Sequence, residues 1–149
     1  MYRRPLMHGT TAADLMTRDV ATVTPDASIR ELAELMHDHR VHGVPVVEDG
    51  RVVGVVSSSD VLWFAERVDR PEPAPPDYDP WDHLDEFRVR DIMTADYFGV
   101  SPSATLDELR RFFERTGVHR ALVLDGESLV GIVSLSDLIG AIAGLRSRS

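Results

Sequence analysis

Two short motifs in the sequence carry side chains that could bind a small anionic ligand. Each reads Gly-x-x-Ser-x-x-Asp, at residues 54–60 and again at residues 131–137. A serine at a helix start can cap the helix, and the nearby N–H groups and positive helix end favour an anion. A carboxylate in the first helical turn can accept two hydrogen bonds from the vicinal hydroxyls of a ribose. The pattern indicates nucleotide binding, although Ser and Asp at this spacing also form an ordinary capping box. The candidate residues are Ser57, Asp60, Ser134 and Asp137.

The two motifs belong to a duplication with a constant offset of 77 residues. Asp-Leu-Met-Thr at 14–17 recurs as Asp-Ile-Met-Thr at 91–94, and Val-His at 41–42 recurs at 118–119. Two copies of one structural unit predict a pseudo-symmetric fold in which any site occurs twice. We assign residues 8–66 to the first repeat, 67–88 to a linker and 89–146 to the second repeat.

Each repeat is predicted to consist of a helix tip, a strand, a helix, a hairpin and a last helix. A β-branched stretch at 20–24 predicts the first strand. Ser28 and Glu31 have the spacing of a capping box at the start of an apolar-striped helix. Asp-Gly at 49–50, repeated at 125–126, predicts tight hairpins between strands that are apolar on nearly every residue. Such strands are typical of sheets covered on both faces, and the fold class is α+β.

The linker at 67–88 is rich in proline, which breaks regular structure. Residues 63–88 hold eight acidic residues against three arginines. Tyr78 and Trp81 in this stretch suggest a loop anchored on the domain surface. The alternative interpretation is a lid over a ligand cleft.

The bulk properties exclude several classes of protein. The 149 residues carry a net charge of −9, which argues against binding to nucleic acid or to an anionic membrane. No apolar run is long enough to span a bilayer and no secretory signal precedes the first repeat, so a soluble cytoplasmic protein is expected. The chain has no cysteine, and the spacing of His37, His39 and His42 does not place them on one helix face. We therefore expect no metal site.

Together these motifs resemble the CBS domain family, named for cystathionine β-synthase, over nearly the whole chain outside the linker. The resemblance is carried by the repeated Asp-x-Met-Thr, by Thr-Pro at 24–25 and Ser-Pro at 101–102, by residues 41–47, and by the two Gly-x-x-Ser-x-x-Asp endings. It implies two β-α-β-β-α repeats packed in a pseudo-twofold intramolecular pair, known as a Bateman module. It also implies two clefts between the repeats that bind adenosine-containing ligands: AMP, ADP, ATP or S-adenosylmethionine.

The family's binding residues carry over to particular positions of this chain. The resemblance implies that Asp60 and Asp137 hold the ribose and that Ser57 and Ser134 face ribose or phosphate. Basic residues before the second strand of each repeat commonly meet the phosphates; they are His42, His119 and Arg120. We expect adenine to lie against Val23, Val44, Val100 and Ala121, for which simple core packing is the alternative. The repeats differ because Gly43 stands where the second has Arg120, so unequal phosphate binding is expected.

The sequence therefore predicts a non-catalytic regulatory module whose adenine nucleotide ligand shifts a conformational equilibrium that a separate protein reads. No nucleophile elbow, phosphate-binding glycine loop or other reacting centre suggests an enzyme. The alternative is a ligand-free scaffold for dimerisation or docking of an enzyme or transporter. A homodimer is expected, and the apolar last helix of each repeat could supply its surface through Trp63, Phe64, Ile139, Ile142 and Leu145. The alternative for these residues is the intramolecular interface between the repeats, and both can hold together.

Overall fold

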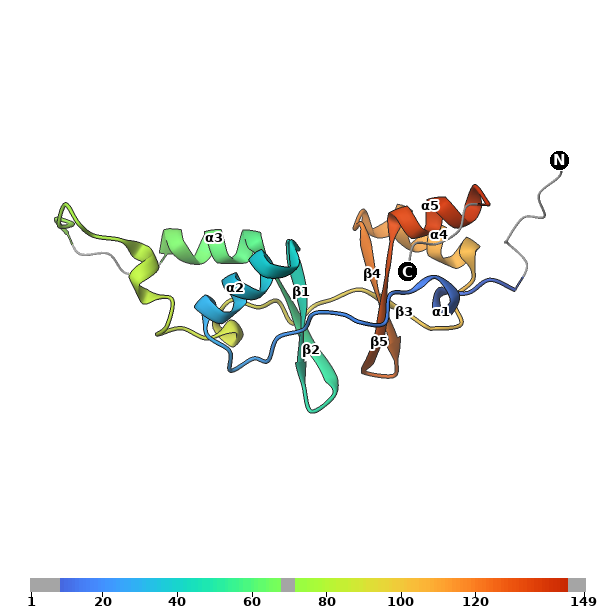
Figure 1. The fold of residues 1–149 in the computed structure, drawn as a ribbon, viewed down its shortest axis with the longest axis horizontal. Helices are drawn as coiled ribbons and strands as arrows, with labels where there is room; N and C mark the ends of the chain where they lie inside the picture. Colours follow the sequence, from blue (N-terminus) through green and yellow to red (C-terminus); the bar gives the residue numbers. More distant parts are fainter. Residues whose placement is uncertain (1–8, 68–71, 145–149) are drawn as a thin grey trace. The chain divides into compact units, whose positions relative to one another are not determined.

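A computed structural model of the chain describes residues 9–67 and 72–144. The chain divides into two compact units, which we call the middle unit (Ala21–Tyr97) and the terminal unit (Met1–Val20 with Phe98–Ser149). The described residues form five α-helices, five strands and two short 3₁₀ helices, labelled in Figure 1. The predicted α+β class is confirmed.

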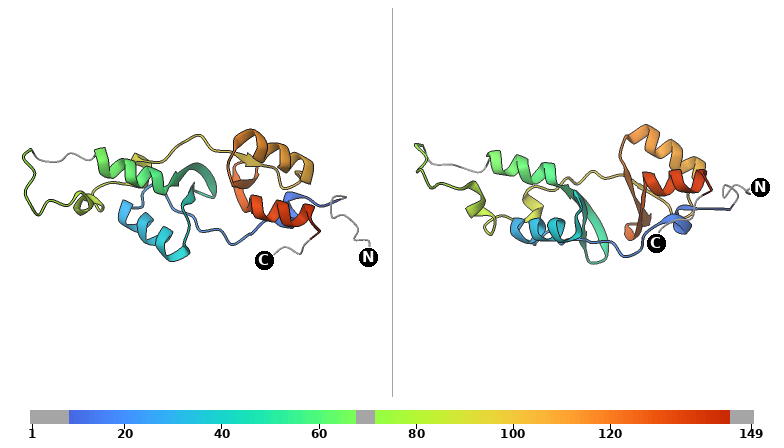
Figure 2. Two further views of the ribbon diagram at one scale, coloured as in Figure 1. Left: turned by 90° about the horizontal axis from the view of Figure 1, so that it is seen from above. Right: turned by 45° about the horizontal axis from the view of Figure 1, so that its top comes forward.

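The middle unit is a β-hairpin with two helices on one of its faces, as all views in Figures 1 and 2 show. Its strands pair antiparallel, and the turn between them has positive φ at Asp49 (52°) and Gly50 (79°). Positive φ at both central residues is what a two-residue hairpin needs, so the predicted Asp-Gly turn is confirmed. The elements are α2 (Ile29–His39), β1 (Gly43–Glu48), β2 (Arg51–Ser57) and α3 (Ser58–Arg67).

The terminal unit repeats this plan and adds a short helix from the start of the chain. A short strand pairs parallel with the first strand of the hairpin, and two helices again cover one face (Figure 1). The elements are α1 (Ala12–Leu15), β3 (Gly99–Val100), α4 (Leu106–Thr116), β4 (Arg120–Asp125), β5 (Ser128–Ser134) and α5 (Leu135–Ile142).

Each unit has its own hydrophobic core between its hairpin and its helices. The fully buried side chains with the largest volumes come from both helices and strands, which fixes the helices against the sheet. In the middle unit they are Ile29, Leu32, Val46, Val56 and Val89, and in the terminal unit Leu109, Val123 and Val133.

The helix tips that open the two repeats are exchanged between the units. In the tip of the first repeat, Leu15 of α1 is buried in the core of the terminal unit, and Thr17 forms a β-bridge with Ile132. In the tip of the second repeat, Ile92 is buried in the core of the middle unit, next to the 3₁₀ helix η2 (Val89–Asp91). Each compact unit is therefore completed by the beginning of the other sequence repeat.

The glycine of each Gly-x-x-Ser-x-x-Asp motif lies against an exchanged tip. A Cβ atom placed on Gly54 would come 2.6 Å from the carbonyl oxygen of Thr94. A Cβ on Gly131 would come 2.6 Å from the sulfur of Met16 and 2.9 Å from the carbonyl oxygen of Thr17. These glycines allow the backbone of the tip to approach the strand closely, which any side chain would prevent.

Helix starts follow the sequence prediction, whereas the first strand does not. The Ser28 hydroxyl accepts a hydrogen bond from the Glu31 N–H at 3.1 Å, so α2 begins at the predicted cap. The strand predicted at 20–24 is wrong in extent, because among these residues Val23 alone pairs, in a bridge to Val46. The N–H of Ala27 donates to Thr24, so the chain already turns after this bridge.

The described part of the linker packs on the middle unit. Leu84 is 8% exposed and contributes to the core, and Trp81 and Phe87 pack against it half-buried. The Phe87 ring meets the Phe64 ring edge to face with centroids 4.8 Å apart. Trp81 belongs to the 3₁₀ helix η1 (Pro80–His83), and its contacts support the anchoring interpretation of this residue.

Candidate functional site

Strand register brings the candidate polar residues of each unit together. In the middle unit Gly43, the first residue of β1, pairs with Ser57 at the end of β2. In the terminal unit Arg120 pairs in the same way with Ser134. The carbonyl oxygens of His42 and His119 accept hydrogen bonds at 2.8 Å from the N–H groups of Ser58 and Leu135, the first residues of α3 and α5. The backbone of His42, which precedes β1, and that of His119, which precedes β4, is thus held beside the helix start that carries the serine and the aspartate.

Ser57 and Asp60 form a reciprocal capping box in the middle unit. The Asp60 Oδ2 accepts hydrogen bonds from the Ser57 N–H at 2.8 Å and from the Ser57 hydroxyl at 3.0 Å. The Ser57 hydroxyl oxygen accepts one from the Asp60 N–H at 3.3 Å. The capping role that the sequence allowed is therefore present, and it involves only one carboxylate oxygen of Asp60.

Ser134 and Asp137 have the same arrangement in the terminal unit. The Asp137 Oδ2 accepts from the Ser134 N–H at 2.9 Å, and the Ser134 hydroxyl oxygen accepts from the Asp137 N–H at 3.0 Å. Within residues 9–67 and 72–144, the Oδ1 atoms of Asp60 and Asp137 accept no hydrogen bond. Each half-buried aspartate thus keeps one oxygen available to an external donor.

The helix starts offer fewer free N–H groups than the motif suggests. The first N–H of each helix is bonded to a histidine carbonyl, and the third to the capping serine. The N–H groups of Ser59 and Ser136, second in their helices, meet no acceptor in the described part of the chain. One backbone donor therefore remains for an anion at each site.

The basic side chains differ between the two sites, as the sequence predicts. His42, His119 and Arg120 are all exposed. The Arg120 guanidinium makes no ion pair with any residue that the structure describes. It starts from the residue paired with Ser134, whereas Gly43 offers no side chain at the equivalent position. An arginine whose backbone pairs with Ser134, and whose guanidinium the described residues leave unpaired, gives the terminal unit a bidentate donor for a phosphate or carboxylate.

The apolar residues expected beside adenine belong mainly to the cores. Val23, Val44 and Ala121 are 8%, 3% and 0% exposed and are members of the core clusters. Core packing, which the sequence also allowed, accounts for their burial. Val100 on β3 is half-buried against the core of the terminal unit.

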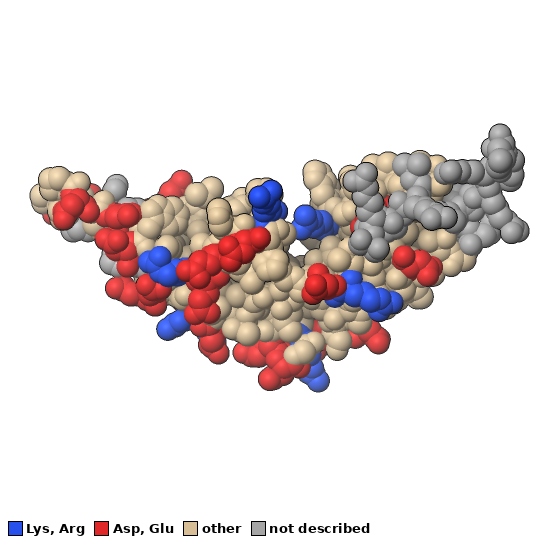
Figure 3. Space-filling model, in the orientation of Figure 1, with Lys and Arg blue, Asp and Glu red and all other residues tan. Residues whose placement is uncertain are grey.

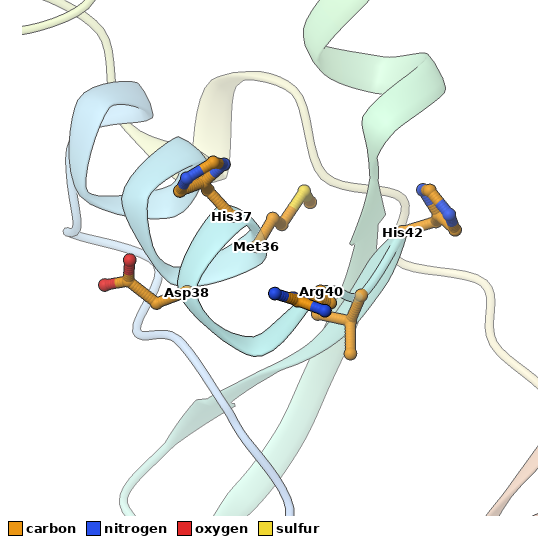
Figure 4. A pocket seen from close by; sticks show the side chains of 6 residues that line it. Met36, His37, Asp38, Arg40 and His42 are labelled. Carbon is orange, nitrogen blue, oxygen red and sulfur yellow. The ribbon is translucent and has the colours of Figure 1, made fainter.

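A pocket of about 590 Å³ lies where α2 ends and β1 begins (Figure 4). It contains His42 together with Arg40 and His37, which the sequence did not indicate as binding residues. The signal for Arg40 was present, because the second repeat has Gly117 at the equivalent position. The linker docks at the opposite end of α2, where the Arg30 N–H donates to the Leu84 carbonyl oxygen at 3.3 Å. The pocket is lined by Met36, His37, Asp38, Arg40, Val41 and His42.

A group of exposed acidic residues lies on the linker segment, and Asp38 lines the pocket itself. Figure 3 shows acidic side chains over the part of the middle unit that carries the linker. Exposed acidic residues of that segment are Glu72, Asp77, Asp79, Asp82, Asp85 and Glu86.

Across residues 9–67 and 72–144, no three His, Asp or Glu side chains are grouped as metal ligands. None of the described helices has the length and apolar character needed to cross a bilayer.

Comparison with known proteins gives the family. Residues 12–66 and 89–144 each match the CBS domain. The chain is 30% identical over 125 residues to the CBS domain-containing protein YhcV of Bacillus subtilis, covering 84% of this chain and 80% of that protein. Other relatives are much longer: the chain spans 23% of the inosine-5'-monophosphate dehydrogenase of Korarchaeum cryptofilum.

Solved structures with the same fold include nucleotide complexes. The structure of CBSX2 in complex with AMP matches with a TM-score of 0.71 and 27% identity, covering 91% of this chain and 98% of that one. The CBS domain of a bacterial CNNM/CorC family Mg²⁺ transporter in complex with ATP matches with a TM-score of 0.70 and 27% identity, covering 95% and 92%. The duplicated sequence, the repeated fold and these matches agree. The chain belongs to the CBS domain family and carries two copies of the CBS domain.

Proposed function

We propose that this protein is a non-catalytic, cytoplasmic regulatory module that binds an adenosine-containing ligand. The observation that carries the proposal is the convergence at each helix start. One free carboxylate oxygen, one free N–H group and an exposed histidine come together in both units, and a free guanidinium joins them in the terminal unit. This donor and acceptor set suits a ribose on the aspartate and a phosphate on the basic groups.

The roles within the proposed site follow from these atoms. Asp60 and Asp137 accept the ribose hydroxyls through Oδ1 while Oδ2 holds the helix cap. Ser57 and Ser134 keep the carboxylates in place, since their N–H groups bind Oδ2. His42, His119 and Arg120 contact the phosphates. Val23, Val44, Val100 and Ala121 shape the wall beside the base from within the cores.

The relatives support a nucleotide rather than another anion. The structure of CBSX2 is a complex with AMP and that of the transporter domain a complex with ATP, and this chain shares 27% identity with each. A ligand that binds one conformation more tightly shifts the population of states by its difference in affinity. A partner protein that recognises one of these states would then respond to the nucleotide.

A thermal-shift screen tests the proposal directly. AMP, ADP, ATP and S-adenosylmethionine are each added at concentrations up to millimolar. A ligand present at 100 times its dissociation constant should stabilise the fold by about 2.7 kcal/mol and raise the melting temperature accordingly. An unchanged melting temperature with all four ligands would remove the proposal.

A second candidate function, a dimerisation or docking scaffold, is favoured by exposed apolar side chains on α3 and α5. Leu62 and Trp63 are 60% and 52% exposed, and Ile139 and Ile142 are 58% and 47% exposed. Leu62 and Ile139 occupy equivalent positions of the two repeats. Phe64, which the sequence suggested for this surface, is 5% exposed and belongs to the core, and Leu145 lies outside the described residues. We propose that the exposed apolar face of α3 and that of α5 each pack against a second copy of the chain.

Sedimentation equilibrium tests the dimer separately from nucleotide binding. A charged residue at an apolar interface is costly to bury, so Leu62→Asp with Ile139→Asp should convert a dimer into a monomer. Both positions are exposed, so the melting temperature of the protomer should change little. A wild-type protein that sediments as a monomer would contradict the homodimer but leave the nucleotide proposal standing.

A further inference from the structure

Arg40 has a backbone conformation that disfavours arginine. It is the C-cap of α2, with φ 53° and ψ 46°, in the left-handed region. The equivalent residue after α4 is Gly117, with φ 72°. Glycine is the usual residue at such a cap because it has no Cβ to clash. An arginine kept in this conformation indicates that its side chain contributes something the cap itself does not require.

The side chain of Arg40 lines the pocket and is not neutralised. It is exposed and makes no ion pair with the residues that the structure describes. In Figure 4 the Asp38 carboxylate points away from Arg40 and from His42. The pocket is therefore lined by a guanidinium that the described residues leave unpaired and by His42, whose carbonyl oxygen accepts from the Ser58 N–H.

The arginine nearest the start of the hairpin lies at a different position in each repeat, and the second repeat also has Arg115 at the position of Asp38. In the second repeat Arg120 follows His119 directly and pairs with Ser134. In the first repeat Gly43 takes that place, and Arg40 precedes it by three residues. The side chain of an arginine is long enough to span such a distance, so the guanidinium can be supplied from the helix cap instead of the strand.

Favourable interaction with the helix dipole is the simpler explanation for a basic residue here. The last turn of α2 already contains His37 and His39, which can serve this purpose. A lysine or arginine one residue earlier would interact with the dipole without a left-handed backbone. The dipole therefore explains the charge but not its place at the cap.

We propose that Arg40 gives the middle unit the phosphate-binding guanidinium that Arg120 gives the terminal unit. The ligand class is a nucleoside phosphate, with its phosphate between Arg40 and His42. This inference rests on the proposed function and adds to it a residue that the family motif does not indicate. Under this proposal each unit has one arginine for its ligand: Arg120 on β4 in the terminal unit and Arg40 at the C-cap of α2 in the middle unit.

The test compares Arg40→Asn and Arg40→Gly with the wild type by isothermal titration. Both residues accept a left-handed backbone, so the melting temperature should stay the same or rise. The affinity of one binding event for ATP and AMP should fall about tenfold or more, since hydrogen bonds between charged groups are lost. Adenosine, which has no phosphate, should bind both variants as it binds the wild type.

Two matched variants and one further probe separate the outcomes. Arg120→Asn should weaken the other binding event, and Arg111→Gln on α4 should weaken neither.

If the wild type binds ATP and Arg40→Asn binds it equally well, the role of Arg40 is wrong and the proposed function stands. If the wild type binds no adenine nucleotide, titration with tripolyphosphate decides. Binding that Arg40→Asn abolishes would support an anion site at Arg40, and no binding would overturn that site together with the proposed function.

Discussion

Asp60 and Asp137 each hold a helix cap with one carboxylate oxygen and leave the other oxygen free. The two functions of such a residue can be separated because they use different atoms. Asparagine retains a carbonyl oxygen that can accept the hydrogen bond from the Ser57 or Ser134 N–H. It loses the negative charge that strengthens a bond to a ribose hydroxyl.

We therefore expect Asp60→Asn and Asp137→Asn to weaken nucleotide binding far more than they weaken the fold. Loss of hydrogen bonds to a charged acceptor should reduce affinity at each site by about 1.5–3 kcal/mol. Loss of stability should stay below about 0.5 kcal/mol, less than for full removal of a cap. Isothermal titration with ADP and urea denaturation measure the two quantities.

Glu108→Gln is the control for this pair. Glu108 accepts from the Thr105 N–H in a capping box at the start of α4, outside the candidate site. It should leave nucleotide affinity unchanged. Equal affinity of wild type and Asp137→Asn would show that the free oxygen of Asp137 does not bind the ribose.

At this scale the sequence marked the candidate polar groups of each unit, apart from Arg40. Ser57, Asp60 and His42 could be found because a local motif and a repeat mark them, and register then joins them in one unit. Arg40 was not marked, although Gly117 at the equivalent position of the second repeat was a signal, because the argument for it needs the backbone φ of 53° as well. The roles of Val23 and Ala121 could not be decided either, since an apolar strand residue fits a core as well as a ligand wall.

Among the elements, β2 and β5 each accept an exchanged tip beside a glycine. The Val55 N–H donates to the Thr94 carbonyl oxygen at 2.9 Å, and the Thr17 N–H donates to the Ile132 carbonyl oxygen at 2.8 Å. A methyl group between tip and strand would force these bonds apart. The motif glycine thus has a packing role beside its place in the family pattern.

Gly54→Ala and Gly131→Ala should each destabilise the protein by about 1–3 kcal/mol through overpacking. The loss should be larger at Gly54, where the nearest atom is backbone, than at Gly131, where the flexible Met16 side chain is nearest. Chemical denaturation measures both changes.

Gly140→Ala is the matched control in α5. A Cβ at Gly140 meets nothing within 4 Å, so better helix propensity should stabilise the protein by about 1 kcal/mol. If Gly54→Ala were as stable as the wild type, the close approach of tip and strand would not exist in solution.

Hairpins and helix starts were predictable from sequence because turn and cap signals are local. The turn at Asp49-Gly50 and the Ser28 and Thr105 caps are in place. The turn predicted at Asp125-Gly126 is wrong by one residue, because Asp125 still pairs with Ser128 and the turn consists of Gly126 and Glu127. The strand at 20–24 reduces to one bridge because a β-branched run does not ensure a partner along its whole length.

For the whole molecule, the exchange of tips separates sequence repeats from packing units. The described residues up to Val20 fold with the described residues from Phe98 onward, and the middle of the chain folds with the tip of the second repeat. The duplication itself could be recognised from the sequence, because the two repeats are related by a constant offset of 77 residues. The exchange was not, because it depends on contacts such as Thr17 with Ile132, which lie far apart in the sequence.

Leu15→Ala and Ile92→Ala test the exchange at this scale. Leu15 is 6% exposed and Ile92 is 9% exposed, and truncation of such side chains costs about 2–5 kcal/mol. Hydrogen exchange should show Leu15→Ala lowering protection in β5 and α5, and Ile92→Ala lowering it in β2 and α3. The reverse assignment, with Leu15→Ala affecting β2 first, would contradict the exchange.

The exchanged tips also bear on how such a protein could arise. A polypeptide with a single repeat would carry a tip that its own strand does not accept and a groove beside glycine with no occupant. Two such polypeptides could complete each other by swapping tips, as domain-swapped dimers do. Gene duplication and fusion would then convert this exchange of tips between two chains into an exchange within one chain. The two copies could afterwards diverge in sequence, as the different positions of Arg40 and Arg120 in the two repeats illustrate.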